Sequence, residues 1–176
     1  MLVLVVGPSG AGKDTLLLGA KAALAGDPRY RFVRRVITRP PDAGAEDYEA
    51  VTETAFAARQ FALQWQAHGL RYGIPAEIAD DIARGLTVIA SVSRLAIEDA
   101  ARRFPVKVVE ITAPPEVLAA RLAMRGREDA GNIASRLARV VALPESVPVE
   151  TIVNDRTPAE GIARLLHVIT QGRPSG

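Results

Sequence analysis

The stretch that decides the fold is Gly7-Pro8-Ser9-Gly10-Ala11-Gly12-Lys13-Asp14-Thr15. Gly7 and Gly12 enclose four residues and a lysine follows, which is the spacing of a phosphate-binding loop. Residues 2–6 before it are all apolar, as in a strand buried on both faces. Residues 16–24 after it are rich in leucine and alanine, which favour a helix. Strand, loop and helix in this order predict a site for nucleotide phosphates, and we favour it over the alternative of a glycine-rich turn that matches by chance.

The residue types of this phosphate loop (residues 7–15) fit the chemistry of anion binding. Glycines let the backbone turn tightly and direct its N–H groups toward an anion. The helix that follows adds its unpaired N-terminal donors and the positive end of its dipole. Lys13 is a mobile cation that can reach the β- and γ-phosphates. We therefore predict that all nine residues of the loop bind the nucleotide and that Lys13 is catalytic.

Asp14 departs from the usual loop, in which a serine or threonine hydroxyl holds Mg²⁺ at this position. A carboxylate is also a hard oxygen ligand and suits Mg²⁺, either directly or through a water. The alternative is that Asp14 only caps the helix. We favour the metal role, because the motif fixes the position, and we expect Thr15 to offer its hydroxyl to the phosphates.

Composition bounds the class of protein. The 176 residues are 48% apolar and 24% charged, with a net charge of +2, so there is no general basic field for nucleic acid. Cysteine is absent, which excludes disulfides and thiolate metal sites. No apolar run approaches the roughly 20 residues of a membrane span. We expect a cytoplasmic protein without nucleic-acid or membrane partners; the oligomeric state stays open, with a homodimer as one alternative.

Strand and helix patterns alternate along the chain, which predicts a parallel sheet covered on both faces. We expect strands over 2–6, 31–37, 86–91, 106–112 and 149–153, a hairpin over 61–67 and 70–74, and helices over 16–24, 53–59, 75–84, 95–103, 115–125, 132–141 and 158–170. Residues 38–48 form a polar loop long enough to be functional. The prediction is one α/β domain over 1–176, three-layered around a five-stranded parallel sheet, with ligands at the carboxyl ends of the strands.

Motifs along the whole chain resemble those of the guanylate kinase branch of the P-loop kinases. They are the phosphate loop, Thr38-Arg39-Pro40, Asp47-Tyr48, Tyr72-Gly73, Arg121-Leu122, Arg125-Gly126-Arg127, Arg136-Leu137 and Val153-Asn154-Asp155. Within that branch, some stretches look like ribose 1,5-bisphosphate phosphokinase: Gly12-Lys13-Asp14, Ile37-Thr38-Arg39-Pro40, residues 65–74 and Val92-Ser93-Arg94.

This resemblance implies an activity and a set of sites. It implies transfer of the γ-phosphate of ATP, with Mg²⁺, to ribose 1,5-bisphosphate, giving 5-phosphoribosyl 1-diphosphate during phosphonate degradation. It also implies an acceptor-binding region over about 38–84 and a lid over about 125–132 that carries catalytic arginines. The residues implied are Arg121, Arg125 and Arg127 for catalysis, and Arg39, Glu46, Tyr48, Gln64, Tyr72, Arg94 and Arg136 for the acceptor.

Three residues argue against guanine as the acceptor. Where guanylate kinases carry guanine-reading acids, this chain has Gln64 in the hairpin and Ser91 and Ser93 after a strand. An amide that accepts one guanine donor turns its own NH₂ toward the next, and a buried group left unpaired costs about 1–3 kcal/mol. Two alternatives stay open: a guanylate kinase, and a catalytically silent guanylate-kinase-like module that binds a partner protein.

Overall fold

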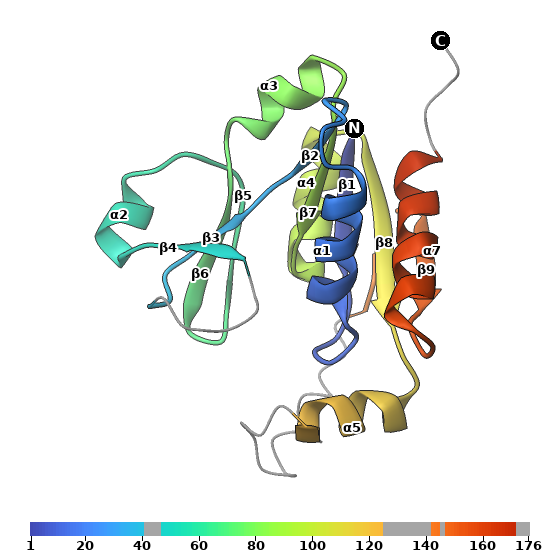
Figure 1. Cartoon of the computed structure of the whole chain (residues 1–176). Coiled ribbons are helices and arrows are strands. Elements are labelled where there is room, and N and C mark those ends of the chain that lie inside the picture. The colour runs from blue at the N-terminus through green and yellow to red at the C-terminus, as the bar shows by residue number, and fades with distance from the viewer. Residues whose placement is uncertain (41–46, 125–141, 145–146, 172–176) are drawn as a thin grey trace. The chain divides into compact units, whose positions relative to one another are not determined.

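The computed structural model describes residues 1–40, 47–124, 142–144 and 147–171. The strands are β1 (Leu2–Val6), β2 (Tyr30–Phe32), β3 (Arg35–Ile37), β4 (Tyr48–Ala50), β5 (Phe61–Ala67), β6 (Leu70–Pro75), β7 (Thr87–Ser91), β8 (Val106–Thr112) and β9 (Val149–Val153). The helices are α1 (Lys13–Ala23), α2 (Glu53–Ala57), α3 (Ile78–Ala83), α4 (Ile97–Arg103), α5 (Pro115–Met124) and α7 (Pro158–Thr170), with a short 3₁₀ helix η1 (Arg94–Ala96). Figure 1 shows their course.

The predicted parallel sheet is present and has five strands in the order β2-β7-β1-β8-β9. Strands β2 and β7 pair in parallel, as do β8 and β9. The side chains of all five residues of β1 are fully buried, which explains why its sequence is apolar throughout rather than alternating.

A second sheet of four strands, in the order β4-β3-β6-β5, contains the predicted hairpin. Strands β5 and β6 pair antiparallel and are joined at His68 and Gly69, whose φ angles are 53° and 72°. Two successive residues with positive φ make the type of tight turn that matches the twist of a hairpin. The sequence predicts the hairpin but not the sheet to which it belongs.

The predicted strand over 31–37 is wrong as a single element. Strand β2 pairs with β7, and the N–H of Val33 still donates to the carbonyl of Ile89 (2.9 Å). After Arg34 the chain leaves that sheet, and β3 pairs instead with β4 and β6. The long loop predicted over 38–48 also ends one residue early, because Tyr48 is the first residue of β4.

Most helix predictions agree with the structure, with shifts at the ends. The helix predicted over 95–103 begins as the 3₁₀ turn η1, and that over 75–84 shortens to α3. The helices over 115–125 and 158–170 correspond to α5 and α7. The helix predicted over 132–141 lies outside the described residues.

The chain divides into two compact units. The first unit comprises Met1–Leu4 and Gly26–Lys107, and the second comprises Val5–Ala25 and Val108–Gly176. In the second unit α1 packs against α7 through glycines. A Cβ at Gly19 of α1 would overlap the side chain of Ile162, and a Cβ at Gly161 of α7 would lie 2.7 Å from Leu16 Cδ2. The two helix backbones therefore approach closely.

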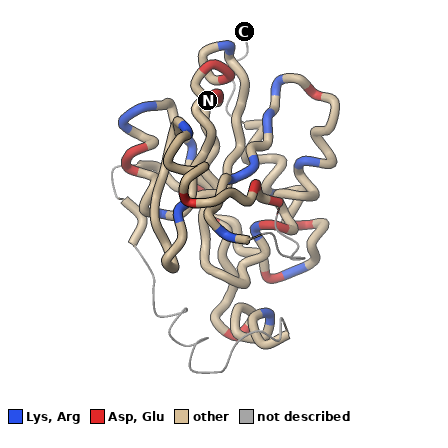
Figure 2. Tube along the Cα trace, turned by 90° about the vertical axis from the view of Figure 1, so that its left-hand side faces the viewer, with Lys and Arg blue, Asp and Glu red and all other residues tan. Residues whose placement is uncertain are grey.

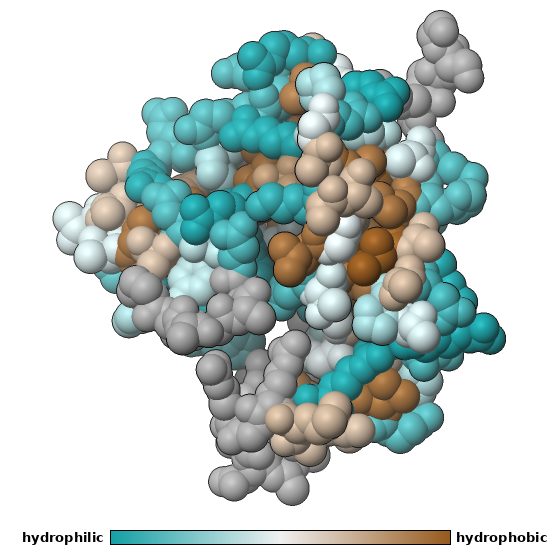
Figure 3. All heavy atoms as spheres, viewed as in Figure 1, coloured by the Kyte–Doolittle hydropathy of each residue, from teal (hydrophilic) through white to brown (hydrophobic). Residues whose placement is uncertain are grey.

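Basic and acidic residues are both spread along the chain, as Figure 2 shows, in agreement with the small net charge. Figure 3 shows apolar side chains gathered over α1 and α5. Leu18 of α1 and Met124 of α5 are the exposed large residues there, at 64% and 81% of their surface. None of the helices described has the length and apolar character needed to span a bilayer.

Candidate active site

The phosphate loop lies in the second unit, between the end of β1 and the start of α1. Its three glycines all have positive φ: 146° at Gly7, 84° at Gly10 and 88° at Gly12. A Cβ at Gly7 would overlap the backbone carbonyl of Ile111 in β8, and one at Gly10 would lie 3.2 Å from the carbonyl of Leu118 in α5. The loop is therefore held against two neighbouring elements in a shape that only glycine adopts readily.

Lys13 is half-buried and folds back over the loop. Its Nζ atom donates to the carbonyl of Gly7 (2.7 Å) and to that of Pro8 (3.1 Å). These carbonyls hold the ammonium group beside the turn of the loop, where the motif requires a cation for the phosphates. The role of Lys13 at the phosphates stays a prediction.

Asp14 does not cap α1. The N-cap position belongs to Gly12, so Asp14 lies within the first turn of the helix and is half-exposed. Among the described residues there is no group of three or more acidic or histidine side chains that could hold a metal by themselves. A single carboxylate fits Mg²⁺, which keeps several waters and takes most of its other ligands from phosphate.

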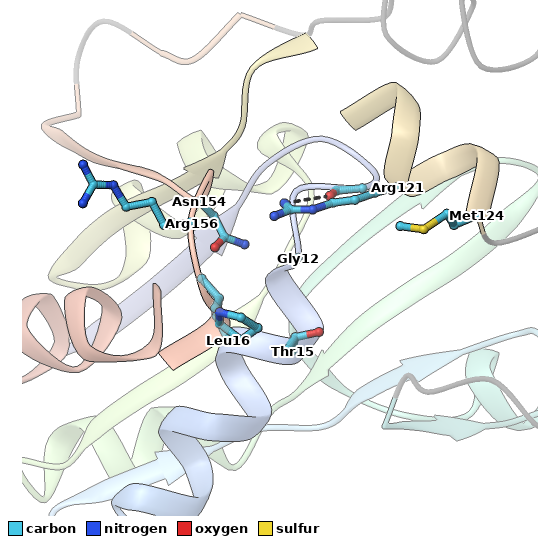
Figure 4. Close-up of a pocket in the computed structure, with 9 residues that line it drawn as sticks. Gly12, Thr15, Leu16, Arg121, Met124, Asn154 and Arg156 are labelled. Carbon is cyan, nitrogen blue, oxygen red and sulfur yellow. Dashed lines mark hydrogen bonds between the residues drawn. The ribbon is translucent and has the colours of Figure 1, made fainter. Parts of the chain in front are cut away.

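A pocket of about 280 Å³ opens beside the loop within the second unit. Figure 4 shows the residues that line it, including Arg121 and Met124 from α5 and Asn154 and Arg156 from the segment after β9. The guanidinium group of Arg121 lies 3.5 Å from the carbonyl oxygen of Gly10. The predicted catalytic residue Arg121 is therefore brought to the phosphate loop.

The start of α7 closes one side of this pocket through Pro158. Thr157 caps the helix: its hydroxyl accepts from the N–H of Glu160 (3.3 Å), whose carboxylate accepts from the N–H of Thr157 (3.1 Å). The hydrogen bond from the backbone of Thr157 lowers the pKa of the Glu160 carboxyl. This reciprocal cap fixes where α7 begins.

The first unit brings together three of the predicted acceptor residues. The guanidinium of Arg39 lies 4.2 Å from the centre of the Tyr48 ring, and the Tyr48 hydroxyl donates to the carbonyl of Pro40 (2.8 Å). Tyr72 stacks on Trp65 with 5.5 Å between ring centres. Residues directly paired across strands share a face, so the register places Tyr48, Tyr72 and Trp65 on one face of the four-stranded sheet.

Gln64 lies on the opposite face of that sheet. It pairs with Gly73, which pairs with Val36 and through it with Glu49. Its side chain is exposed. The structure therefore does not bring Gln64 together with Tyr48 and Tyr72.

The carboxyl end of β7 also belongs to the first unit. The hydroxyl of Ser91, the last residue of the strand, is buried and has no hydrogen-bond partner among the described residues. Ser93 caps η1, and its hydroxyl accepts from the N–H of Leu95 (3.3 Å). Arg94 follows as the first residue of η1 and is half-buried.

No family model matches the sequence. Comparison of the whole sequence with known proteins identifies its relatives. The chain is 52% identical over 172 residues to ribose 1,5-bisphosphate phosphokinase PhnN of Acidiphilium cryptum, a match that covers 98% of this chain and 93% of the relative. It is 51% identical over 172 residues to the protein of that name from Methylobacterium radiotolerans, which covers 94% of each.

The chain belongs to the ribose 1,5-bisphosphate phosphokinase family. Membership of this kinase family implies the use of ATP and confirms the resemblance found in the sequence. Among solved structures, guanylate kinase from Anaplasma phagocytophilum aligns with a TM-score of 0.67 at 18% identity, over 96% of this chain and 84% of that one. This likeness confirms the P-loop kinase fold.

Four of the residues that the phosphokinase resemblance implied lie outside the described residues: Glu46, Arg125, Arg127 and Arg136. The lid over 125–132 lies there too. The roles of all these residues stay predictions.

Sequence reasoning about this phosphokinase chain missed part of the pocket lining. Met124, Arg156 and Pro158 carried no motif, although two of them follow the last strand, at the edge where α/β folds bind ligands. In the sequence, Asn154 is only part of the Val153-Asn154-Asp155 stretch that carries the resemblance. In the structure it is buried and its amide donates to the phosphate loop itself.

Proposed function

We propose that this chain transfers the γ-phosphoryl group of ATP to the 1-phosphate of ribose 1,5-bisphosphate, forming 5-phosphoribosyl 1-diphosphate in phosphonate degradation. The observation that carries the proposal is the 52% identity, over 98% of the chain, to a relative named for this substrate. The arrangement of the phosphate loop, Lys13 and Arg121 in the second unit supports the ATP half of the reaction.

The phosphate loop binds the polyphosphate of ATP through its backbone N–H groups, and Lys13 places a positive charge on the β- and γ-phosphates. Asp14 would hold Mg²⁺, which supplies neutralisation of charge on the transferring group when bound, and Thr15 would offer its hydroxyl to the phosphates. Arg121 approaches the loop from α5, and Arg125 and Arg127 follow it in the sequence as the proposed lid arginines. A guanidinium presents planar paired donors that match phosphate oxygens.

Residues 38–84 are the proposed acceptor-binding region, with Arg94 added from η1. Arg39 supplies a cation and Tyr72 a hydroxyl donor suited to sugar phosphates, and Tyr48, whose hydroxyl donates to Pro40, holds the Arg39 guanidinium over its ring. A kinase that phosphorylates a hydroxyl would position a carboxylate as the base at the end of β7. This chain has Ser91 and Ser93 there instead. A phosphate acceptor is already anionic near neutral pH and needs no base.

The step balances without another reactant. An oxygen of the acceptor's 1-phosphate forms a bond to the γ-phosphorus of ATP, and the bond from that phosphorus to the β–γ bridging oxygen breaks. ADP leaves with that electron pair. Arginines and Lys13 hold two polyanions in line, and this positioning is the chief work of such a site.

The test is a coupled ADP-release assay with ribose 1,5-bisphosphate and with GMP as separate acceptors, and the product is identified by ³¹P NMR. We expect turnover with ribose 1,5-bisphosphate and little with GMP. Turnover of GMP at ordinary kinase rates, without any on ribose 1,5-bisphosphate, would make the chain a guanylate kinase and overturn the proposal.

A pair of lysine variants shows that the activity belongs to this site. Lys13→Ala is expected to lose turnover by at least about 100-fold, because the cation at the β- and γ-phosphates is removed. Lys21→Ala, at an exposed position in the last turn of the same helix, is the matched control and keeps it. A chain that fails to bind ATP by calorimetry would instead be the silent binding module.

A further inference from the structure

Asn154 connects the end of β9 to the phosphate loop. Its backbone N–H donates to the carbonyl of Thr112 in β8 (2.7 Å), which continues the pairing of β8 with β9. Its side-chain Nδ2 donates to the carbonyl of Ala11 (2.8 Å), a residue 143 positions earlier in the sequence. Only 6% of Asn154 is exposed. A side chain held this way has little freedom to move.

The amide of Asn154 fills a slot between two glycines. A Cβ at Gly12 of the loop would lie 2.5 Å from Nδ2, and a Cβ at Gly161 of α7 would lie 2.8 Å from Oδ1. The Ala11 carbonyl can only accept a hydrogen bond, so the NH₂ of the amide must face the loop and its oxygen must face α7. The two glycines and one acceptor therefore fix both ends of the side chain.

The bond to Ala11 fixes a whole peptide unit. The carbonyl of Ala11 and the N–H of Gly12 belong to one planar peptide, and the described residues contain no cis peptide. In a trans peptide these two groups point in opposite directions. When Asn154 holds the carbonyl on its own side, the N–H of Gly12 is turned away from Asn154.

A peptide beside glycine turns over easily, because glycine adopts positive and negative φ with similar ease. Gly12 has a φ of 88° and is the N-cap of α1, so its N–H belongs to the group of donors that the loop offers to phosphate. A reversed peptide would present a carbonyl dipole in place of that donor.

We propose that Asn154 is a positioning residue that prevents the Ala11–Gly12 peptide from reversing and so keeps the Gly12 N–H available to the nucleotide phosphates. The alternative role for Asn154 is a direct contact with the adenine of ATP. The inference rests on the proposed function only in so far as the loop binds phosphate, and it does not depend on which acceptor is used.

The experiment measures binding with and without the base. Calorimetry with Mg²⁺ compares ATP, GTP and inorganic tripolyphosphate on the full chain, for the wild type, Asn154→Asp and Asn154→Ala. Asn154→Asp keeps the shape but replaces the donor by an acceptor, so it remains informative if Asn154→Ala fails to fold. Thr151→Ala, at an exposed position of β9, is the matched control.

We expect both Asn154 variants to lose affinity for all three ligands by the same factor, about 10- to 100-fold, the range for one hydrogen bond to a charged group. The ratio of ATP to GTP affinity should not change. Binding is measured below the unfolding midpoint of each variant, found by thermal melting.

Two results would overturn the proposal. One is wild-type affinity for tripolyphosphate with a loss confined to ATP, which would make Asn154 an adenine contact. The other is wild-type affinity for all three ligands in a variant with a lowered melting temperature, which would leave only a role in stability. If only the acceptor assay fails, the proposed function is contradicted and the role of Asn154 can still be tested by binding. If the wild-type chain binds no tripolyphosphate, both proposals are contradicted.

Discussion

Asp14 is the residue at which this phosphate loop departs most from the usual pattern. Its place in the first turn of α1, rather than at the cap, leaves the carboxylate half-exposed beside the loop. There it adds a negative charge near a polyphosphate. That charge is useful only if a cation accompanies the nucleotide.

We predict that Asp14→Asn lowers Mg²⁺-dependent turnover by about 10- to 100-fold, the range for groups that hold a metal or orient its ligands. Binding of ATP without metal should not weaken, because one negative charge near the phosphates is removed. Turnover is measured against Mg²⁺ concentration, and metal-free binding is measured by calorimetry with a chelator. Glu98→Gln, at an exposed position of α4, is the control. Equal losses with and without metal would refute the metal role.

At the scale of single residues, the sequence predicts the role of a residue where that role follows from local spacing. The glycines of the loop and Lys13 belong to one short motif, and their geometry agrees with it. Asn154 could not be predicted in the same way, because its partner Ala11 is distant in the sequence and contributes only a backbone carbonyl. Gln64 carries a family resemblance, but which face of a strand it occupies depends on a register that the sequence does not state.

At the scale of elements, the packing of α1 on α7 depends on glycines rather than on interlocking side chains. The Cδ1 atom of Ile162 occupies the space that a Cβ atom on Gly19 would need. Helix propensity alone would favour alanine at this position by about 1 kcal/mol. Packing opposes it.

We predict that Gly19→Ala destabilises the protein by about 1–3 kcal/mol, because the new methyl group overpacks the contact between the helices. Ile162→Ala removes the three side-chain atoms that lie nearest the new methyl group, so the double variant should be more stable than the sum of the single changes indicates. Urea unfolding of the four proteins of this cycle measures the coupling. A strictly additive cycle would show that the two residues do not meet.

The predicted strand over 31–37 shows why elements are harder to predict than motifs. Its residues have the composition of one strand, and both halves are indeed strands. What divides them is a change of partner, since β2 pairs with β7 and β3 with β4 and β6. Partners lie far along the chain, so a local pattern carries no information about the change. By contrast, the strands predicted over 106–112 and 149–153 match β8 and β9, because β9 pairs with β8 along its whole length.

At the scale of the whole molecule, the residues proposed for the two substrates fall in different compact units. The phosphate loop, Arg121 and Asn154 belong to the second unit, and Arg39, Tyr48 and Tyr72 belong to the first. Each substrate should therefore protect a different set of backbone amides from hydrogen exchange.

We predict that Mg²⁺ with ATP slows hydrogen exchange in residues 7–15, and that ribose 1,5-bisphosphate slows it in β4, β6 and η1. Binding lowers the population of locally open states, so protection follows the contacts made. Mass spectrometry of peptides from the full chain measures both patterns, with α3 as the internal control. Protection of β4 and β6 by ATP alone, with none from the sugar phosphate, would contradict the assignment of the acceptor region.

Strand β1 has one more consequence, and it concerns how the molecule is made. Its neighbours in the sheet are β7 and β8, and the carbonyl of Met1 accepts from Val88. Every strand that covers its backbone edges is synthesised after it. Until then five consecutive apolar residues of high β propensity stand open to other chains, a recognised hazard for aggregation. Substitutions in β1 should therefore change the amount of protein that escapes aggregation before they change the rate of catalysis.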